Sequence, residues 1–342
     1  MLKRIRYGIQ EKSSVPTKEE IDNEEVKILS NRLRANTPKE TLTNILEWQD
    51  RNLKFWEERW FTSNSLRLIS RLLFMCIILA FVTEVLSLTS ITLIFVITIF
   101  LLLGASIPLI VNLVKKYKNV KRIIPEFRIG DTFKISLPVE KILKYRLSVC
   151  RDYAKLTSAL LLNIYPNSEL YSVSIPNIHV ATAIKINNKM YMLDQKLPVL
   201  TLEKWVQIWK ERLKKKKLKL DLIRIIKDME GIKTKRAKYT ESIGQINKID
   251  TTKIVDELKR KLEIKEIDKG PNFKDYLEIT IPLYAYLYEE DDITEFSIIE
   301  SIKNRIEDEL TGKIKEIYNL TINQKDKDLV LKIQLTGERN EA

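Results

Sequence analysis

Histidine, cysteine and glycine are scarce in this chain of 342 residues, which has one His, two Cys and eight Gly. One His and two Cys supply too few ligands for a Cys/His zinc site, and we expect neither a metal nor a cofactor. Two cysteines far apart in sequence also exclude the disulfide framework of a small secreted domain. The closest glycines, Gly231 and Gly244, lie 13 positions apart. The chain therefore has no Walker loop and no G-x-G-x-x-G motif for nucleotide phosphates.

Charge is nearly absent from one long stretch of the sequence. Residues 72–83 and 85–114 carry no charge, and Glu84 is the single interruption. A membrane-spanning helix needs about 20 apolar residues, so this stretch is long enough for two spans joined by a tight turn. We expect a transmembrane hairpin with helices at about 68–88 and 92–114. The alternative is a buried helical hairpin of a soluble protein, although such helices rarely run uncharged for this long.

Basic residues flank this hairpin on both sides. Arg67 and Arg71 precede it, several Lys and Arg follow it between 115 and 122, and the short connecting loop has no Lys or Arg. Because cytoplasmic flanks carry the excess of Lys and Arg, the pattern predicts a multi-pass cell-membrane protein with two spans. Its partner is then the lipid bilayer, and both termini are cytoplasmic.

The segment before the hairpin reads as mostly helical. Thr37 and Glu40 have the spacing of a capping box, and Pro38 occupies the first helical position between them. We expect this helix to run to about Trp60. Its three tryptophans either lie at the membrane interface or pack in a cytosolic core; they are Trp48, Trp56 and Trp60.

An α+β pattern begins after the hairpin. Ser148 has the position of an N-cap for a helix that starts near Cys150 and carries apolar residues at helical spacing. Three strand-like runs follow at 170–175, 179–186 and 190–193, and Asn187-Asn188 supplies the turn between the last two. A helix followed by an antiparallel meander is an α+β arrangement.

Three residues of this part have the order required for thiol catalysis. Cys150 lies at a helix start, where the helix dipole favours a thiolate. His179 opens one strand and Asp194 ends the next, and pairing around the Asn-Asn turn places Asp194 opposite residue 181, within reach of His179. An imidazole that takes the thiol proton and a carboxylate that orients it would complete a triad. From these residues alone, a core Cys, a structural His and a turn Asp remain open as the alternative.

The motifs in this region are recognisable as a set. They are Ser148-Val-Cys-Arg-Asp-Tyr-Ala154, His179-Val-Ala181 and Tyr191-Met-Leu-Asp-Gln195. Together they resemble the transglutaminase-like superfamily of papain-like cysteine enzymes. The run from Gln195 to Trp205 and the upstream Ile45–Asn52 are similar to an archaeal, membrane-associated branch of it. Many relatives have an aromatic residue where this chain has Ala181.

The resemblance implies a papain-like core with Cys150 as nucleophile, His179 as general base and Asp194 as orienter. We expect a cytosol-facing enzyme that acts on an amide or acyl bond of a protein or peptide, as a hydrolase or acyltransferase. The alternative is a catalytically degenerate domain that serves as a membrane-tethered binding or scaffold module, because the superfamily includes both kinds.

Composition divides the chain into five parts. We expect an N-terminal helical segment at 1–66, the transmembrane hairpin at 67–114, the catalytic core at 115–210, a basic helical segment at 211–240, and a separate small α+β unit at 241–342. In the last part, strands are predicted at 276–288 and 328–335, with a helix at 295–310 between them.

The net charge of +13 is concentrated in two blocks. Residues 115–128 are net +5, and Lys204–Lys238 are net +10. Within the second block, the run Lys214–Lys217 with Lys219 lacks the stacking aromatics of a single-strand binder, so we do not expect nucleic acid as a partner. The second block either contacts anionic lipid headgroups or is a solvated helix face. Abundant Lys, Glu and Ile fit a thermophile.

Overall fold

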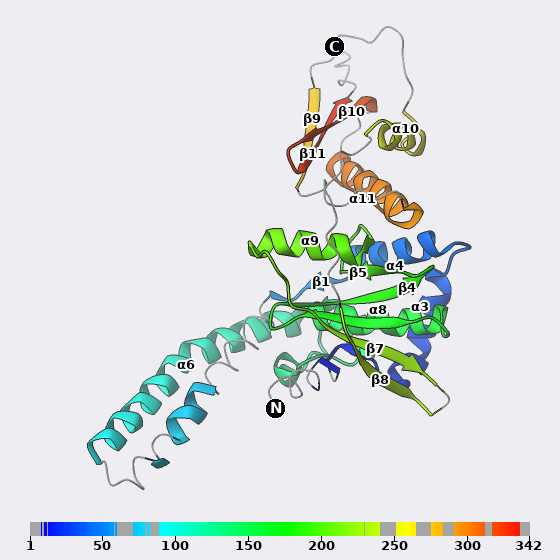
Figure 1. Cartoon of the computed structure of the whole chain (residues 1–342). Helices are drawn as coiled ribbons and strands as arrows, with labels where there is room; N and C mark the ends of the chain where they lie inside the picture. The colour runs from blue at the N-terminus through cyan, green and yellow to red at the C-terminus, as the bar shows by residue number, and fades with distance from the viewer. Residues whose placement is uncertain are drawn as a thin grey trace. The chain divides into compact units, whose positions relative to one another are not determined.

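The computed structural model describes residues 8, 10, 11, 13–57, 59, 71–78, 81–82, 89–228, 230–239, 251–264, 275–282, 291–311 and 317–335 (Figure 1). Residue contacts group the chain into two compact units. One unit comprises 1–52 with 153–342, and the other comprises 53–152. The five boundaries inferred from composition stay predictions.

The larger unit is built on an antiparallel six-stranded sheet with the order β6-β5-β4-β3-β7-β8 (Figure 1, green). Its first three strands along the chain lie where the sequence predicts them: β3 spans Leu170–Ile175, β4 His179–Ile186 and β5 Lys189–Leu193. The turn between β4 and β5 places Asn187 and Asn188 at φ 48° and 63°, the region that Asn tolerates best among non-glycine residues. The remaining strands are β6 Leu200–Thr201, β7 Asp221–Lys227 and β8 Ile232–Ala237.

Helices pack on this sheet through alternating positions of β4. Helix α8 (Cys150–Ile164) contacts Thr182, whose hydroxyl donates to the carbonyl of Ala154 at 2.8 Å. The neighbouring Ala181 and Ala183 instead join the core formed with helix α9 (Leu202–Leu213). Because side chains alternate along a strand, successive β4 residues meet different helices.

The N-terminal helices of this unit are α2 Lys18–Asp22, α3 Glu24–Leu33 and α4 Pro38–Asn52. The capping box predicted for α4 is confirmed: the N–H of Glu40 donates to Thr37 Oγ1 at 3.3 Å, and the N–H of Thr37 donates to the Glu40 carboxylate at 3.2 Å. The predicted end near Trp60 is wrong, because α4 ends at Asn52 and β1 (Lys54–Phe55) pairs in parallel with β2 (Leu147–Ser148). Trp60 itself lies outside the described residues.

The basic segment after α9 is also not the helix that the sequence predicted. Helix α9 ends at Leu213, where Lys214 takes a left-handed conformation. The chain then forms β7 and β8, and β7 pairs with β3 over Asp221–Ile225. Buried Leu222, Ile223 and Ile225 fill this central position, and such residues favour a strand that packs on both sides.

The C-terminal part of the larger unit contains α10 (Thr251–Lys261), α11 (Asp292–Leu310) and a three-stranded sheet with the order β10-β11-β9. Strands β9, β10 and β11 span Asp275–Ile281, Ile317–Lys325 and Asp328–Leu335. The predicted strand at 328–335 is confirmed, the predicted helix begins three residues earlier, and α10 and β10 were not predicted. The predicted strand at 276–288 ends at Ile281, and residues 283–288 lie outside the described part.

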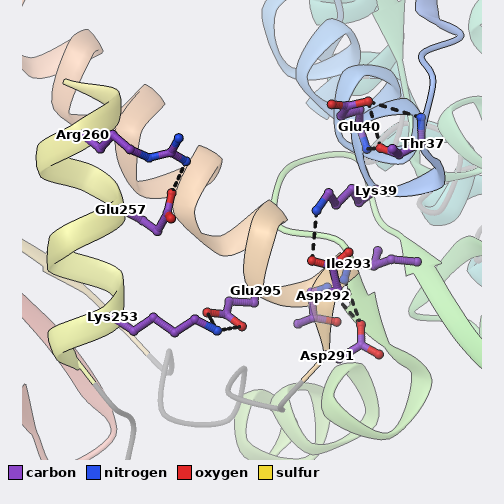
Figure 2. A network of polar contacts seen from close by, with 11 residues as sticks. Thr37, Lys39, Glu40, Lys253, Glu257, Arg260, Asp291, Asp292, Ile293 and Glu295 are labelled. Carbon is purple, nitrogen blue, oxygen red and sulfur yellow. Dashed lines mark hydrogen bonds and ion pairs between the residues drawn. The ribbon is translucent and has the colours of Figure 1, made fainter. Parts of the chain in front are cut away.

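A polar network joins the start of α11 to its neighbours (Figure 2). Asp291 caps α11 by accepting the N–H groups of Ile293 and Thr294 at 3.2 and 3.1 Å. Lys39 at the start of α4 donates to Asp292 at 3.0 Å. Strand β5 also contacts this helix start, because the hydroxyl of Tyr191 donates to Asp291 at 2.7 Å.

The smaller unit contains one long apolar helix, α6 (Thr89–Ile123), drawn in cyan in Figure 1. Residues 96–123 of it are long and apolar enough to cross a membrane, and most of the apolar side chains described in this range are exposed. Among the described residues this is the one helix that meets these criteria, so the predicted hairpin is not shown. The first predicted span, 68–88, falls largely outside the described residues, although 71–78 are helical.

Short elements complete the smaller unit. These are the 3₁₀ helix Ile129–Phe133 and helix α7 (Val139–Tyr145). Phe127 lies beside both Trp56 and Tyr145, with ring centroids 5.2 and 5.5 Å apart, respectively. Of the alternatives left open for the tryptophans, buried packing is what the structure shows for Trp48 and Trp56.

Candidate functional site

The meander β4-β5 brings His179 and Asp194 together. The register predicted from the Asn-Asn turn is confirmed, since Thr182 pairs with Leu193 and Asp194 follows directly after β5. His179 Nε2 lies 2.6 Å from Asp194 Oδ1, which is a short hydrogen bond. The two side chains are 11% and 18% exposed, so the pair is largely shielded from water.

The second carboxylate oxygen of Asp194 is also bound. Trp205, on α9, donates its indole N–H to Asp194 Oδ2 at 2.7 Å. Burial raises the pKa of Asp194, but the charge and hydrogen bond of His179 and the hydrogen bond from Trp205 outweigh it, and the positive charge of Arg212 adds to them. The pKa of Asp194 therefore lies below its ordinary value, and the residue serves as an ionised acceptor for the imidazole.

One face of α9 covers the imidazole of His179. The ring centroid of Trp209 lies 4.7 Å from that of His179, and the centroid of Trp205 lies 6.2 Å from it. Arg212 lies over the Trp209 ring at 5.3 Å from its centroid. Residues 205, 209 and 212 follow helical spacing, so a single helix face supplies all three.

Cys150 is the first residue of α8 and is buried. The predicted N-cap, Ser148, is wrong: Ser148 lies in β2 and its buried hydroxyl has no hydrogen-bond partner within the described part of the chain. Asp152 performs the capping instead, since its carboxylate accepts the N–H of Val149 at 3.0 Å and that of Leu137 at 2.7 Å.

A buried arginine holds the capping carboxylate at this helix start. Arg59 forms an ion pair with Asp152, and their side chains are 1% and 0% exposed. Arg59 also donates to the carbonyl of Lys134 at 3.0 Å. Cys150 belongs by contacts to the smaller unit, whereas His179 and Asp194 belong to the larger one. The triad as a whole therefore stays a prediction.

The upstream sequence patch on α4 contacts the same core. Gln49 donates to the hydroxyl of Thr157 on α8 at 2.8 Å, and both side chains are buried. The neighbouring Asp50 forms an ion pair at 2.7 Å with Lys196, two residues after Asp194. The two stretches that suggested a resemblance are therefore in contact.

Sequence reasoning gave no role to Trp205, Trp209 or Arg59. The signal for the first two was present, because they lie on one face of an amphipathic helix shortly after Asp194. Nothing in the sequence pointed to Arg59, whose partner Asp152 is 93 positions away. Among the described residues, no group of three or more His, Cys, Asp or Glu is arranged to hold a metal ion.

Comparisons with known proteins show which family the chain resembles. A family model described as a transglutaminase-like domain matches residues 24–223. A UPF0252 protein of Methanocaldococcus jannaschii is 28% identical over 320 residues, which cover 84% of this chain and 86% of that protein. A second UPF0252 protein of that organism is 33% identical over 110 residues, covering 30% of this chain and 31% of its own. A UPF0252 protein of Pyrococcus horikoshii is 37% identical over 76 residues, which cover 21% of this chain and 25% of that protein.

No solved structure matches the chain significantly. The matched range covers more than half of the chain and contains Cys150, His179 and Asp194, together with the α4 patch. The similar proteins come from archaea, as the resemblance implied. The chain therefore belongs to the transglutaminase-like domain family whose model matches residues 24–223.

Proposed function

We propose that this protein is a membrane-anchored cysteine enzyme that hydrolyses an amide bond of a protein or peptide, or transfers the acyl group of that bond to an amine. Cys150 is the nucleophile, His179 the general base and Asp194 the orienter. The single observation that carries the proposal is the hydrogen-bonded chain from His179 through Asp194 to Trp205. A buried imidazole held by an ionised carboxylate is the arrangement that thiol activation needs.

The chemistry follows from these groups. His179 takes the thiol proton, and the Cys150 sulfur attacks the carbonyl carbon of the amide. The C–N bond breaks, the amine leaves with that proton, and a thioester remains on Cys150. Water or a second amine then attacks the thioester, and its proton returns through His179 to the sulfur. Hydrolysis or acyl transfer results according to the attacking group.

Local geometry supports Cys150 as the nucleophile. It begins α8, and its backbone N–H at this helix start is proposed as a donor to the oxyanion. Ala154, four residues later in α8, accepts the hydroxyl of Thr182 at 2.8 Å, and Thr182 belongs to the strand that begins with His179.

Labelling by a thiol-reactive vinyl-sulfone or acyl probe tests the proposal on the full chain in detergent micelles. We expect the wild-type protein and the Cys76→Ala variant to be labelled, and the Cys150→Ala variant to lose the label. His179→Ala should slow labelling strongly, because the thiol then lacks its base. Equal labelling of the two cysteine variants would refute Cys150 as the nucleophile.

The burial of Cys150 favours a second candidate function. Its side chain is 6% exposed, and a buried Cys is often a small core residue. The same domain would then be a catalytically degenerate module that binds a partner at the membrane. Absence of labelling in a folded wild-type protein, together with capture of a peptide by both the wild type and Cys150→Ala, would support this function over the first.

Membrane anchoring is part of the proposal and is supported by α6. Its apolar part, about residues 92–114, measures roughly 35 Å at 1.5 Å per residue, which is close to the thickness of a hydrocarbon core. Lys and Arg follow in the same helix, as at a cytoplasmic boundary. We propose two spans in the cell membrane, with both termini in the cytoplasm.

Extraction and vesicle binding test the membrane part. The full chain should resist alkaline carbonate extraction from membranes, and a variant with Phe100→Arg and Leu101→Arg should be released. The second basic block, Lys204–Lys238, is proposed to contact anionic lipid headgroups as the alternative to a solvated face. Binding to zwitterionic and anionic vesicles in equal amounts at low salt would remove that contact from the proposal.

A further inference from the structure

Asp194 is bound at both carboxylate oxygens by groups from different elements. His179, at the start of β4, occupies Oδ1, and Trp205, in the first half of α9, occupies Oδ2. The backbone at Asp194 turns sharply, since the N–H of Lys196 donates to the Asp194 carbonyl at 2.6 Å and Gln195 has a φ of 64°. Asp194 therefore lies outside the strand pairing, and its side-chain contacts fix the orientation of the carboxylate.

The indole of Trp205 is suited to this task. Its side chain is 2% exposed, so its position is set by packing in the core between α9 and the sheet. An indole N–H only donates, and it cannot accept a proton from the carboxylic acid form of Asp194. The contact therefore favours the ionised carboxylate and directs its other oxygen to the imidazole.

Trp209 offers a natural comparison on the same helix. Its ring lies nearer to His179 than that of Trp205 does, at 4.7 Å against 6.2 Å between centroids. However, the hydrogen bond to Asp194 comes from Trp205. Substituting each tryptophan in turn therefore distinguishes the effect of ring packing against His179 from the effect of the hydrogen bond that orients Asp194.

We propose that Trp205 is a positioning residue that holds Asp194 in the orientation that binds and directs the His179 imidazole. The effect that this positioning should have on the reactivity of the Cys150 thiol rests on the proposed function. The effect on the hydrogen bond between His179 and Asp194 is independent of that function, because the pair is present in the structure whether or not Cys150 reacts.

A single histidine makes this hydrogen bond directly observable. In the full chain in detergent micelles, labelled with ¹⁵N-histidine, the ring N–H of His179 should give one strongly downfield proton resonance. We expect Trp205→Phe to remove this resonance or to shift it markedly upfield. Trp209→Phe should retain it. Circular dichroism and thermal melting establish that both variants are folded. An unchanged resonance in folded Trp205→Phe would overturn the proposal.

The reverse experiment covers the case in which Trp205→Phe does not fold. In ¹⁵N-tryptophan-labelled protein, which has five indole groups, Asp194→Ala should move one indole N–H resonance upfield by more than the others. Trp209→Phe identifies the second indole near this site. If no indole N–H responds to Asp194→Ala beyond small general shifts, the contact between Trp205 and Asp194 is refuted.

Probe labelling then measures the consequence for the thiol. Trp205→Phe should slow labelling of Cys150 by about ten-fold or more, the effect of losing a hydrogen bond to a charged group. Trp209→Phe should slow it by less than about three-fold. If the wild type is not labelled but Trp205→Phe still loses the His179 resonance, the proposed enzyme is refuted and the positioning role is kept. Wild-type labelling with equal rates in both variants would refute the positioning role and keep the enzyme.

Discussion

The buried ion pair between Arg59 and Asp152 yields the sharpest prediction about stability. We consider Arg59→Met, which keeps an unbranched apolar stem and removes the guanidinium. Asp152 then stays buried without its ion-pair partner, because its side chain is 0% exposed. Its two hydrogen bonds from backbone N–H groups, those of Leu137 and Val149, are present before and after the change.

The magnitude follows from what remains at the site. Removing one partner of a buried ion pair costs about 3–5 kcal/mol. The two retained N–H donors keep part of the stabilisation of the carboxylate, so we expect the lower end, about 3 kcal/mol. The loss also includes the hydrogen bond from Arg59 to the carbonyl of Lys134. Because Asp152 caps α8, the start of that helix next to Cys150 should loosen first.

Thermal unfolding in detergent micelles, combined with amide hydrogen exchange, measures this effect. The matched control is Arg51→Met, which breaks the pair between Arg51 and Glu47 on α4. Arg51 is 59% exposed, and an exposed helix pair of this kind contributes about 0.3–0.5 kcal/mol. We expect faster exchange of the Leu137 and Val149 amides in Arg59→Met alone. Equal melting temperatures in the two variants would refute the reasoning.

Two further predictions concern the sheet and α11. The pKa of Asp291 is lowered because hydrogen bonds from Tyr191 and the Thr294 N–H, together with Lys189, outweigh burial, which raises it. Its contribution to stability is therefore complete above the ordinary carboxyl pKa and is lost as the pH falls through the lowered value, so Asp291→Asn should flatten the acid limb of a pH–stability curve. Gly231 has a φ of 147°, in the turn that links β7 to β8. Gly231→Ala should cost about 1–2 kcal/mol through backbone strain alone, because an added Cβ meets no atom within 4 Å; an unchanged urea midpoint would contradict this.

Much of the site could be predicted because it is local in sequence. The bounds of β3 and β4 agree with the structure, since alternation of apolar residues and clear turn residues mark them. The Asn187-Asn188 turn fixed the register of the hairpin, and the register placed Asp194 within reach of His179, 15 positions away. The capping box of α4 was predictable for the same reason, because all its groups lie within four residues.

The wrong predictions concern contacts that are distant in sequence. The helix ending at Asn52 looked as if it would continue to Trp60, but Lys54 and Phe55 pair with β2, more than 90 positions away. The basic segment looked helical, but β7 is held as a strand by pairing with β3. Ser148 looked like a helix cap, but Asp152 is fixed by Arg59 and takes that role.

The sequence by itself thus determined the α+β class, the apolar stretch that contains α6, and the residues that carry the chemistry of the proposed site. Their spacing is short, and periodicity and turn preferences act over short distances. Only the tertiary structure decided which groups support them. Trp205 reaches Asp194 because α9 packs on the sheet, and Arg59 reaches Asp152 because β1 pairs with β2. A buried hydrogen bond or ion pair depends on what surrounds both partners, and that information is not local in the chain.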